Sequence, residues 1–216
     1  MDSRKAHLDF LVEGYTMQLF LEQILPRLLP ADTSFDVFNL GGKSEFLKKV
    51  PKRLRGHANW LPTNPTHRVV LVVDSDTDDC AEFRENLVAA VRKAELNVAS
   101  HTAKQDGQVL PRIAVEMLEA WYFGDPHALE QAYGSAFKNM SQKRGLREPD
   151  AIRDPARRLE NLLSSVPKHK GGLKKIELTT DIAPHIDVEN NSSPSFQRFR
   201  DGVRFLTTQI QECHAS

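Results

Sequence analysis

The chain has 216 residues, and its 29 Lys and Arg balance its 29 Asp and Glu, so the formal net charge is zero. This length allows one well-buried core, with at most a small additional subdomain. The balanced charge excludes attraction of a polyanion by the global field, so nucleic-acid contact would need local basic patches. The two cysteines, Cys80 and Cys213, lack metal-ligand spacing and indicate reduced thiols.

The first seven residues lead into a strand pattern and not into the apolar region of a signal peptide. No apolar run approaches the roughly 18 residues that a membrane span needs. We therefore expect a cytoplasmic protein with no membrane partner. The sequence leaves open whether the chain forms a homo-oligomer.

In the first half, strand and helix patterns alternate. Apolar runs predict strands at residues 8–12, 35–40, 68–73 and 96–103, and the run at 68–73 is apolar enough to be central. Helical periodicity lies between them, at 16–29, 43–54 and 79–95, with Thr16 as a cap and Pro30 as a stop. Strands alternating with helices of this length predict βαβ units and a mainly parallel sheet.

The second half is mainly helical. A short strand is expected at 112–115 and helices at 116–123, 128–132, 156–163 and 173–185. Ser193-Pro194, a capping serine before a first-turn proline, predicts a final helix to about residue 212. The predicted fold is α/β, a mainly parallel Rossmann-like sheet flanked by helices. Residues 1–125 would form this domain, and 126–216 a helical C-terminal extension packed on it.

Three acids stand where apolar strands stop: Glu13 after the first, and Asp74 and Asp76 after the most apolar one. Residues just past the carboxyl ends of parallel strands line the ligand-binding crevice of open sheets. Asp74 and Asp76 would leave the same face of an extended backbone. Together the three carboxylates predict a hard divalent cation, whereas Glu13 alone could instead cap the next helix.

A second acidic pair, Glu116 and Glu119, is spaced i and i+3 and would share one face of a helix. A solvated stripe is the alternative for such a pair. The apolar residues on both sides favour burial, where an acid needs a partner. Asp78 and Asp79 follow Asp76 and are expected to cap a helix.

Basic residues gather in three local clusters that could contact phosphate. Gly41-Gly42-Lys43 lies at a strand-to-helix turn, where a helix N-terminus can hold a phosphate, although the full P-loop pattern is missing. The candidate phosphate-contacting residues are Lys43, Lys48, Lys49, Lys170 and Lys174. Surface helices also carry such charges by default.

Val12-Glu13-Gly14, with Thr16 and Phe20, followed later by Asp74-Ser75-Asp76, resembles the Toprim domain of topoisomerases, primases and OLD-type nucleases. That domain places a glutamate after its first strand and an Asp-x-Asp after a later one, and these bind magnesium. The resemblance implies a Toprim-like sheet and assigns Glu13, Asp74 and Asp76 to a first metal.

Over nearly its whole length the chain looks more specifically like a bacterial family of Toprim-like proteins of unknown function, numbered four-two-seven-six. The segments that carry this resemblance are Gly41-Gly42-Lys43, Arg112-Ile113-Ala114-Val115-Glu116-Met117-Leu118-Glu119-Ala120-Trp121, Gly124-Asp125-Pro126 and Ser193-Pro194-Ser195-Phe196. It implies that Glu116 and Glu119 complete a second metal position. It also suggests an ABC/SMC-like ATPase of a phage-defence system as partner. Tyr15-Thr16-Met17 departs from the Toprim pattern, which has a further acid near Glu13.

The resemblance favours a Mg²⁺- or Mn²⁺-dependent nuclease acting on DNA or RNA, with Glu116 or Glu119 as second-metal ligand or general base. One alternative is a non-catalytic regulatory or docking subunit of an ATPase complex, which the neutral charge and the missing acid favour. A phosphatase of the haloacid dehalogenase type is a weaker alternative. That class has threonine four residues after the first aspartate, where this chain has Asp78, with Thr77 one residue early.

Overall fold

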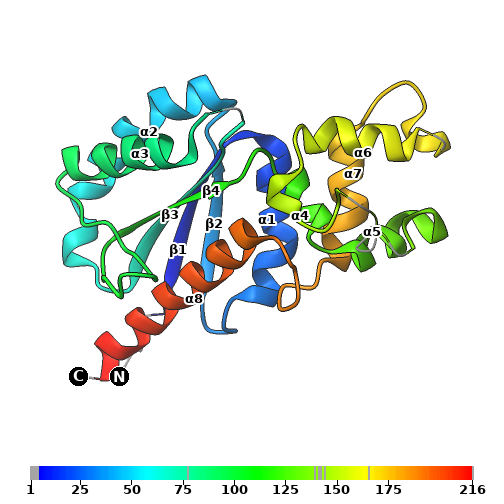
Figure 1. Ribbon diagram of the computed structural model, residues 1–216. Coiled ribbons are helices and arrows are strands. Elements are labelled where there is room, and N and C mark those ends of the chain that lie inside the picture. Colours follow the sequence, from blue (N-terminus) through cyan, green and yellow to red (C-terminus); the bar gives the residue numbers. More distant parts are fainter. Residues whose placement is uncertain are drawn as a thin grey trace.

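Four parallel strands form the central sheet of the computed structural model (Figure 1), which describes residues 5–76, 78–138, 140, 143, 145–164 and 166–215. Thr77 and Arg144, and the side chain of Cys213, lie outside the described part. The strand order is β2-β1-β3-β4, and every pairing is parallel. The strands are β1 (His7–Val12), β2 (Ser34–Asn39), β3 (His67–Asp74) and β4 (Val109–Ala114). The predicted α/β class and the central position of β3 are confirmed.

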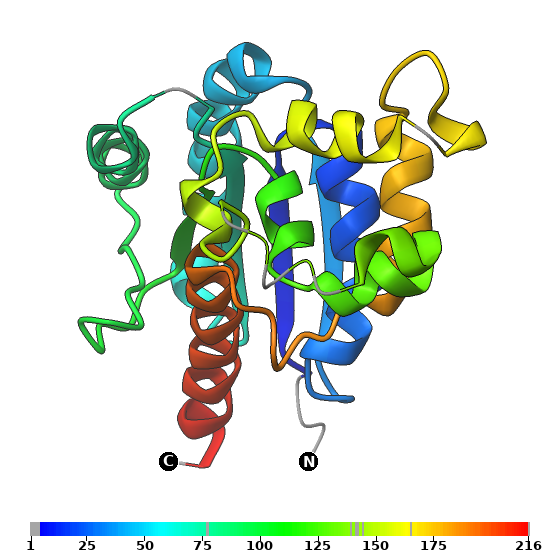
Figure 2. The ribbon, with the colours of Figure 1, turned by 45° about the vertical axis from the view of Figure 1, so that its right-hand side comes forward.

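Helices cover both faces of the sheet (Figures 1 and 2), namely α1 (Gly14–Leu28) on one face and α2 (Lys43–Ala58) and α3 (Cys80–Lys93) on the other. The two-residue period of a strand divides its side chains between two cores. In β3, Val70 and Val72 pack on the α1 side and Leu71 on the α2 side. Residues 10–12 of β1 and 69–73 of β3 are therefore all apolar, as expected of a sheet buried on both faces.

Among the described residues the second half supplies five α-helices, and four of them, α4 to α7, form a group beside α1 (Figure 1). The last helix, α8, instead returns to the sheet and packs on β3 and β4. Apolar residues of α1, α7 and α8 belong to one continuous core with β1. The bounds are α4 (Glu119–Phe123), α5 (Pro126–Tyr133), α6 (Pro155–Leu163), α7 (Lys175–Ile182) and α8 (Pro194–Ala215), with short 3-10 turns at Leu61–Thr63, Gly134–Phe137, Pro149–Ala151, Pro167–His169 and Ala183–His185.

The predicted start of the last helix is confirmed. Ser193 Oγ accepts a hydrogen bond of 3.2 Å from the backbone N–H of Phe196, and Pro194 occupies the first helical position. Asp150 braces this start, because its carboxylate accepts bonds from Ser193 Oγ at 2.6 Å and from the Ser195 N–H at 2.7 Å. Ser195 Oγ in turn accepts from the indole of Trp121 at 2.8 Å. The family-like segments at 121 and 193–196 are therefore in direct contact.

The strand predicted at 96–103 is wrong. This segment makes one parallel bridge, Val98 to Val109, and one antiparallel bridge within itself, Ser100 to Gln105. The chain turns back at Lys104, whose φ of 49° is left-handed, and then enters β4. The Ala99 N–H still donates to Val109 O at 2.8 Å, but the Ser100 N–H donates to Gln105 O instead, so the pairing with β4 ends after one bridge and the segment does not become a fifth strand.

Other helix boundaries also differ from the predictions. The helix expected at 116–123 is only α4, because Glu116 has a left-handed φ of 57° and cannot continue a helix. The helix expected to begin at Thr16 begins at Gly14. The segment 173–185 divides into α7 and a 3-10 turn.

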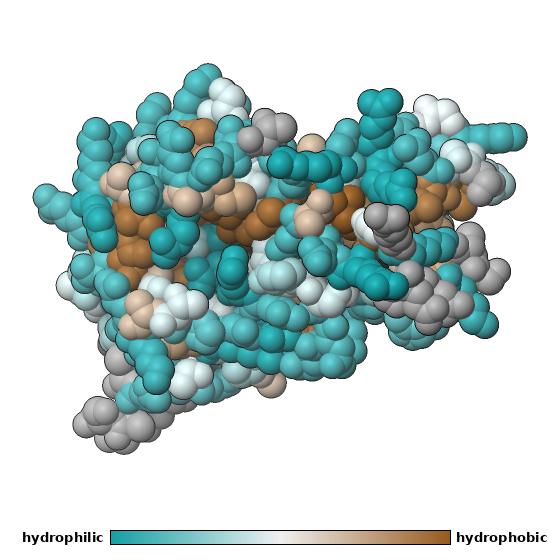
Figure 3. Space-filling view, in the orientation of Figure 1, coloured by the Kyte–Doolittle hydropathy of each residue, from teal (hydrophilic) through white to brown (hydrophobic). Residues whose placement is uncertain are grey.

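Apolar side chains reach the surface in a narrow band on the face shown in Figure 3, with hydrophilic side chains above and below it. In the same orientation, Figure 1 shows the sheet at the height of this band, between the helices that cover its two faces. No helix in the described part of the chain combines the length and apolar character required to cross a membrane.

Candidate functional site

The acids predicted at the strand ends lie at one edge of the sheet. β1 and β3 are parallel neighbours, so Glu13 and Asp74 follow adjacent carboxyl ends. The Glu13 N–H donates to Val72 O at 3.1 Å, which fixes Glu13 beside the end of β3. Gly14 has a φ of +74°, which glycine adopts without strain, and its N–H donates to Gly41 O at 2.9 Å. This contact brings the start of α2 to the same place.

Three carboxylate oxygens at this edge are buried and have no hydrogen-bond partner within the described structure: Glu13 Oε2, Asp74 Oδ1 and Glu119 Oε2. Glu13 occupies the N-cap position of α1, yet its side chain makes no cap bond, so the alternative capping role is not what the structure shows. Glu119, from α4, is only 4% exposed. An unpartnered buried carboxylate is costly and points to a cation.

The electrostatics of the site reflect this crowding. Burial raises the pKa of Asp74 well above its usual value, and the charges of Glu119, Glu13 and Asp76 raise it further. Burial also raises the pKa of Glu13, again helped by Asp76, although hydrogen bonds with the Asp74 and Lys43 backbone oppose the shift. The chain alone therefore does not supply enough positive charge to hold these acids in their ordinary ionised state.

Lys43, the first residue of α2, reaches into the site. Its ammonium donates to Ser75 O at 2.6 Å and to Asp76 Oδ2 at 3.1 Å, and it pairs with Asp78 at 2.8 Å. It also lies 4.6 Å from the centre of the Phe83 ring. Burial would lower the pKa of Lys43, but the bonds to Asp78 and Asp76 outweigh burial and raise it. Of the two expected capping acids, Asp79 caps α3 and Asp78 instead faces this lysine.

A second lysine, Lys175, pairs with another acid of the site. Its ammonium lies 3.0 Å from Glu119 Oε1. Burial would lower the pKa of Lys175, but Glu119 and then Asp74 and Asp76 raise it. Sequence reasoning placed this residue in a basic cluster but singled out its neighbour Lys174, which pairs with Glu177 at 3.4 Å. Lys175 is the first residue of α7, and its neighbour Ile176 is exposed, so periodicity alone gave no signal.

Asp76 does not continue the strand. Its φ of 50° is left-handed, so the expectation that Asp74 and Asp76 project from one face of an extended backbone is wrong. The Asp76 N–H donates to Glu116 O at 2.7 Å, and the Glu116 N–H donates to Ser75 Oγ at 2.8 Å. These bonds join the ends of β3 and β4 beyond the sheet and hold both turns in place.

The carboxylate of Glu116 is engaged elsewhere. Its Oε1 pairs with Arg153 at 2.9 Å and its Oε2 accepts from the Asp154 N–H at 3.0 Å. Glu116 and Glu119 therefore do not share a helical face, contrary to the prediction, because only Glu119 belongs to α4. Of the two, Glu119 is the one that points into the acidic site.

The other candidate phosphate-contacting lysines lie away from the carboxylates. Lys48 and Lys49 pair with Glu45 on α2, at 3.4 and 3.7 Å, and Lys49 also donates to Leu40 O. Lys170 and Lys174 are exposed on the helical side of the molecule. Among these five lysines, the structure brings only Lys43 to the acidic site.

A groove of about 520 Å³ beside β4 carries positive charge that the sequence did not indicate as a cluster. Its basic side chains come from α3, β4 and α8, namely Arg84, Arg112 and Arg198, and His101 also lines it. Burial lowers the pKa of Arg112 to about 10, and the like charges of Arg84 and Arg198 contribute. Val115, the neighbour of Glu116, lines the same groove. The groove therefore lies on the β4 side of the carboxylate site.

The donors of the acidic site fit a hard divalent cation, because carboxylate oxygens are its preferred ligands and three of them are buried without partners. Within the described residues, no three acids of this site bring ligand atoms within 4.8 Å of one another; His7, Asp9 and His67 are the set that does. Mg²⁺ commonly keeps several waters and uses one or two carboxylates directly, which suits acids that do not all converge on one point.

Comparison with known proteins assigns the chain at the level of a family. A family model described as a domain of unknown function (DUF4276) matches residues 12–204. The chain belongs to this family. The match covers Glu13, Lys43, Asp74, Glu119 and Lys175. No curated protein and no solved structure matches the chain.

Proposed function

We propose that this member of the family is a metal-dependent nuclease of the Toprim type, which hydrolyses phosphodiesters with Mg²⁺ or Mn²⁺. The observation that carries the proposal is the set of buried, unpartnered carboxylate oxygens of Glu13, Asp74 and Glu119 at the strand ends. Their number at one edge of the sheet is explained by a cation better than by solvation or helix capping.

Glu13, Asp74, Asp76 and Glu119 would hold the metal. When bound, the ion supplies Lewis-acid polarisation of a phosphate oxygen and a water nucleophile at neutral pH. Lys43 pairs with Asp76 and Lys175 with Glu119, so their ammonium groups are close enough to the acids to stabilise charge on a phosphate. Burial and the charge of Asp76 raise the pKa of Glu13 in the metal-free chain, a shift that a bound cation would oppose.

The basic groove beside β4 supports a nucleic acid as substrate. Arg84, Arg112 and Arg198 line it, and Val115 joins it to the turn that carries Glu116. Guanidinium groups are well suited to phosphate oxygens. A nucleic-acid strand lying in this groove would pass beside the carboxylates. A local basic groove of this kind allows a protein of zero net charge to bind a polyanion.

Cleavage assays test the proposal. Single-stranded DNA, double-stranded DNA and RNA are incubated with Mg²⁺ or Mn²⁺ and with wild type, Asp74→Asn or the exposed, remote control Asp32→Asn. We expect cleavage by wild type and Asp32→Asn and a loss of at least about 100-fold in Asp74→Asn, the size typical of removing a key electrostatic group. Equal cleavage by wild type and Asp74→Asn would exclude the site.

One observation favours a second function, that of a non-catalytic docking subunit of an ABC/SMC-like ATPase. Lys43 and Lys175 already pair with acids of the site, so the chain neutralises part of the cluster itself. This function predicts no cleavage with either metal and co-purification with an ATPase. A dehalogenase-type phosphatase has less support, because it leaves Glu13 and Glu119 without a role, and Thr77 lies outside the described residues.

A further inference from the structure

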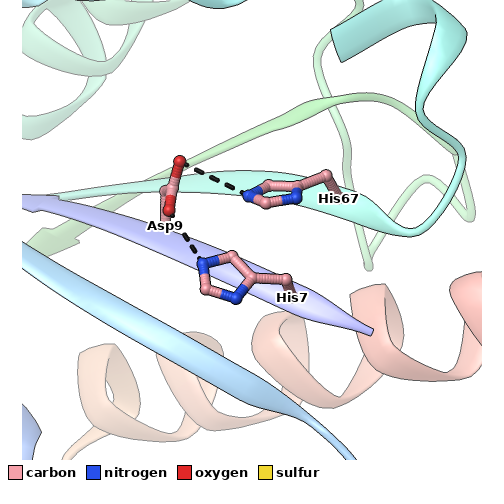
Figure 4. Close-up of side chains that lie close together, drawn as sticks. All are labelled: His7, Asp9 and His67. Atoms are coloured by element: carbon pink, nitrogen blue, oxygen red, sulfur yellow. Dashed lines mark hydrogen bonds and ion pairs between the residues drawn. The ribbon is translucent and has the colours of Figure 1, made fainter. Parts of the chain in front are cut away.

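Three histidines and one aspartate gather at the other end of the sheet, where the strands begin. His7 and Asp9 belong to β1, His67 begins β3, and His57 comes from the last turn of α2. Figure 4 shows the imidazoles of His7 and His67 pointing toward the carboxylate of Asp9 from neighbouring strands. The cluster shares no residue with the carboxylate site.

The distances within this cluster are short. His7 Nε2 lies 3.1 Å from Asp9 Oδ1, and His67 Nε2 lies 3.6 Å from Asp9 Oδ2. His7, Asp9 and His67 each offer a ligand atom, and all three atoms lie within 4.8 Å of one another. Four-coordinate zinc has bonds of about 2.0–2.1 Å, which places tetrahedral ligand atoms about 3.3 Å apart. His7 and His67 approach different oxygens of Asp9, at distances close to that value.

The cluster is enclosed. Asp9 is 7% exposed, and the side chains of His7 and His67 are 20% and 21% exposed. Burial alone would raise the pKa of Asp9, but bonds from His57, His67 and His7 outweigh it and lower the pKa far below its usual value. The carboxylate of Asp9 thus faces three imidazoles on an inner strand of a buried sheet.

His7, one of the two histidines that could bind a metal, is also oriented by a contact at its other ring nitrogen, as metal-ligating histidines usually are. His7 Nδ1 lies 2.8 Å from Ser34 Oγ, on β2, which leaves Nε2 to face Asp9. His57 Nδ1 lies 2.8 Å from Arg53 O, and its Nε2 donates to Asp9 Oδ2 at 3.0 Å. His57 therefore holds one oxygen of Asp9 while His7 and His67 converge on the carboxylate.

We propose that His7, His67 and Asp9 bind a divalent transition-metal ion of the Zn²⁺ class, with His57 as a positioning residue for Asp9. Imidazole nitrogens select Zn²⁺, Cu²⁺, Ni²⁺ or Co²⁺ over the Mg²⁺ that an all-oxygen site prefers. The ion ties the starts of β1 and β3 together and, through His57, to the end of α2. His7 and Asp9 precede the region matched by the family model, whereas His67 lies within it.

The test uses the full chain, stripped of metal and then dialysed against Zn²⁺ in the presence of excess Mg²⁺, which saturates the carboxylate site. Metal content and the visible spectrum of a Co²⁺ substitute are measured for wild type, His7→Ala and His67→Ala. We expect one ion per chain in wild type and its loss in both variants. His57→Ala should bind about 10- to 100-fold more weakly, as removal of an outer partner usually does.

Two controls separate this site from other parts of the molecule. Asp74→Asn should retain the ion, so failure of the proposed nuclease leaves this site intact, and the exposed His127→Ala should also retain it. If an alanine variant does not fold, X-ray absorption of Zn²⁺-loaded wild type must show two imidazole ligands. The absence of bound Zn²⁺ in wild type, binding that is unchanged in His7→Ala and His67→Ala, or oxygen-only ligation would overturn the proposal.

Discussion

Asp74 is the residue whose surroundings say most about the site. It ends a strand that is apolar on both faces, and its neighbours in space are Glu13, Asp76 and Glu119. A carboxylate so placed loses water without gaining a partner for Oδ1. The position of Asp74 was predictable from the sequence, because the end of an apolar strand is visible in consecutive residues. Its three acidic neighbours come from three separate segments, and the contribution of Glu119 depends on how α4 packs.

The raised pKa of Asp74 predicts a specific dependence of stability on pH. When the chain is free of metal, the folded state keeps a proton on Asp74 that the unfolded state loses above about pH 3.8. The free energy of unfolding should therefore fall as pH rises from about 3.8 through the raised pKa, by about 1.4 kcal/mol per pH unit for one proton. Asp74→Asn has no such proton and should become more stable than wild type as pH rises.

Urea unfolding at a series of pH values in EDTA measures this difference, with Asp32→Asn as the control that follows wild type. Added Mg²⁺ should stabilise wild type and have little effect on Asp74→Asn, because the ion binds only the folded carboxylate set. A stability gap between wild type and Asp74→Asn that does not change with pH would contradict the burial of an uncompensated acid here.

The conformation of Glu116 could not be predicted from the residues around it in the sequence. The spacing of Glu116 and Glu119 indicated one helical face, but a single left-handed residue separates Glu116 from α4. That conformation is fixed by the hydrogen bonds to Ser75 and Asp76, which lie about forty residues earlier. Lys175 was overlooked for the same reason, since its partner Glu119 belongs to a different helix.

At the scale of elements, apolar periodicity predicted the strands that are buried on two faces, and it failed for the segment at 96–103. That segment alternates like a strand, yet after one bridge to Val109 its chain turns back and Ser100 pairs with Gln105. A local hairpin competes with sheet addition, and sequence pattern does not distinguish them. Caps were predicted well where the signal is local, as at Ser193-Pro194 and Asp79.

The junction of α4 with α8 gives a prediction about packing. A Cβ on Gly124 would lie 2.0 Å from Asn191 Oδ1, and Asn191 is fully buried with its amide donating to Trp121 O at 2.8 Å. Gly124→Ala should therefore lower the free energy of unfolding by about 1–3 kcal/mol, as overpacking does. Urea denaturation measures the change.

Gly56, inside α2, provides the matched control because a Cβ there meets nothing within 4 Å. Gly56→Ala should stabilise the protein by about 0.5–1 kcal/mol through helix propensity. If Gly124→Ala were as well tolerated as Gly56→Ala, the contact between Gly124 and Asn191 would not be a close one.

At the scale of the whole molecule, charge is distributed so that zero net charge coexists with a basic groove. Arg84, Arg112 and Arg198 are far apart in sequence and meet only because α3, β4 and α8 meet. The linear clusters of lysine were visible in the sequence, but most of them lie on exposed helices away from the acids. This is why the sequence located the acidic site better than the groove that would receive a substrate.

The groove predicts how binding responds to salt. Arg198→Ala should weaken binding of nucleic acid about equally for all sequences and reduce the slope of log affinity against log salt by about one. Fluorescence anisotropy in Ca²⁺, which limits cleavage, measures both quantities. Arg92→Ala, on α3 but outside the groove, is the control and should behave as wild type. An unchanged affinity and slope in Arg198→Ala would place the nucleic acid on another surface.

Helix α2 has one further consequence, because it contributes to both ends of the molecule. Its first residue, Lys43, lies among the strand-end acids, and His57, in its last turn, bonds to Asp9 at the start of the strands. Fourteen residues of helix separate them, a rise on the order of 20 Å. Helix α2 therefore extends from one proposed metal site to the other. With Mn²⁺ at the carboxylates and Cu²⁺ at the histidines, the magnetic dipolar coupling between the ions would measure the separation of the two proposed sites, without any catalytic assay.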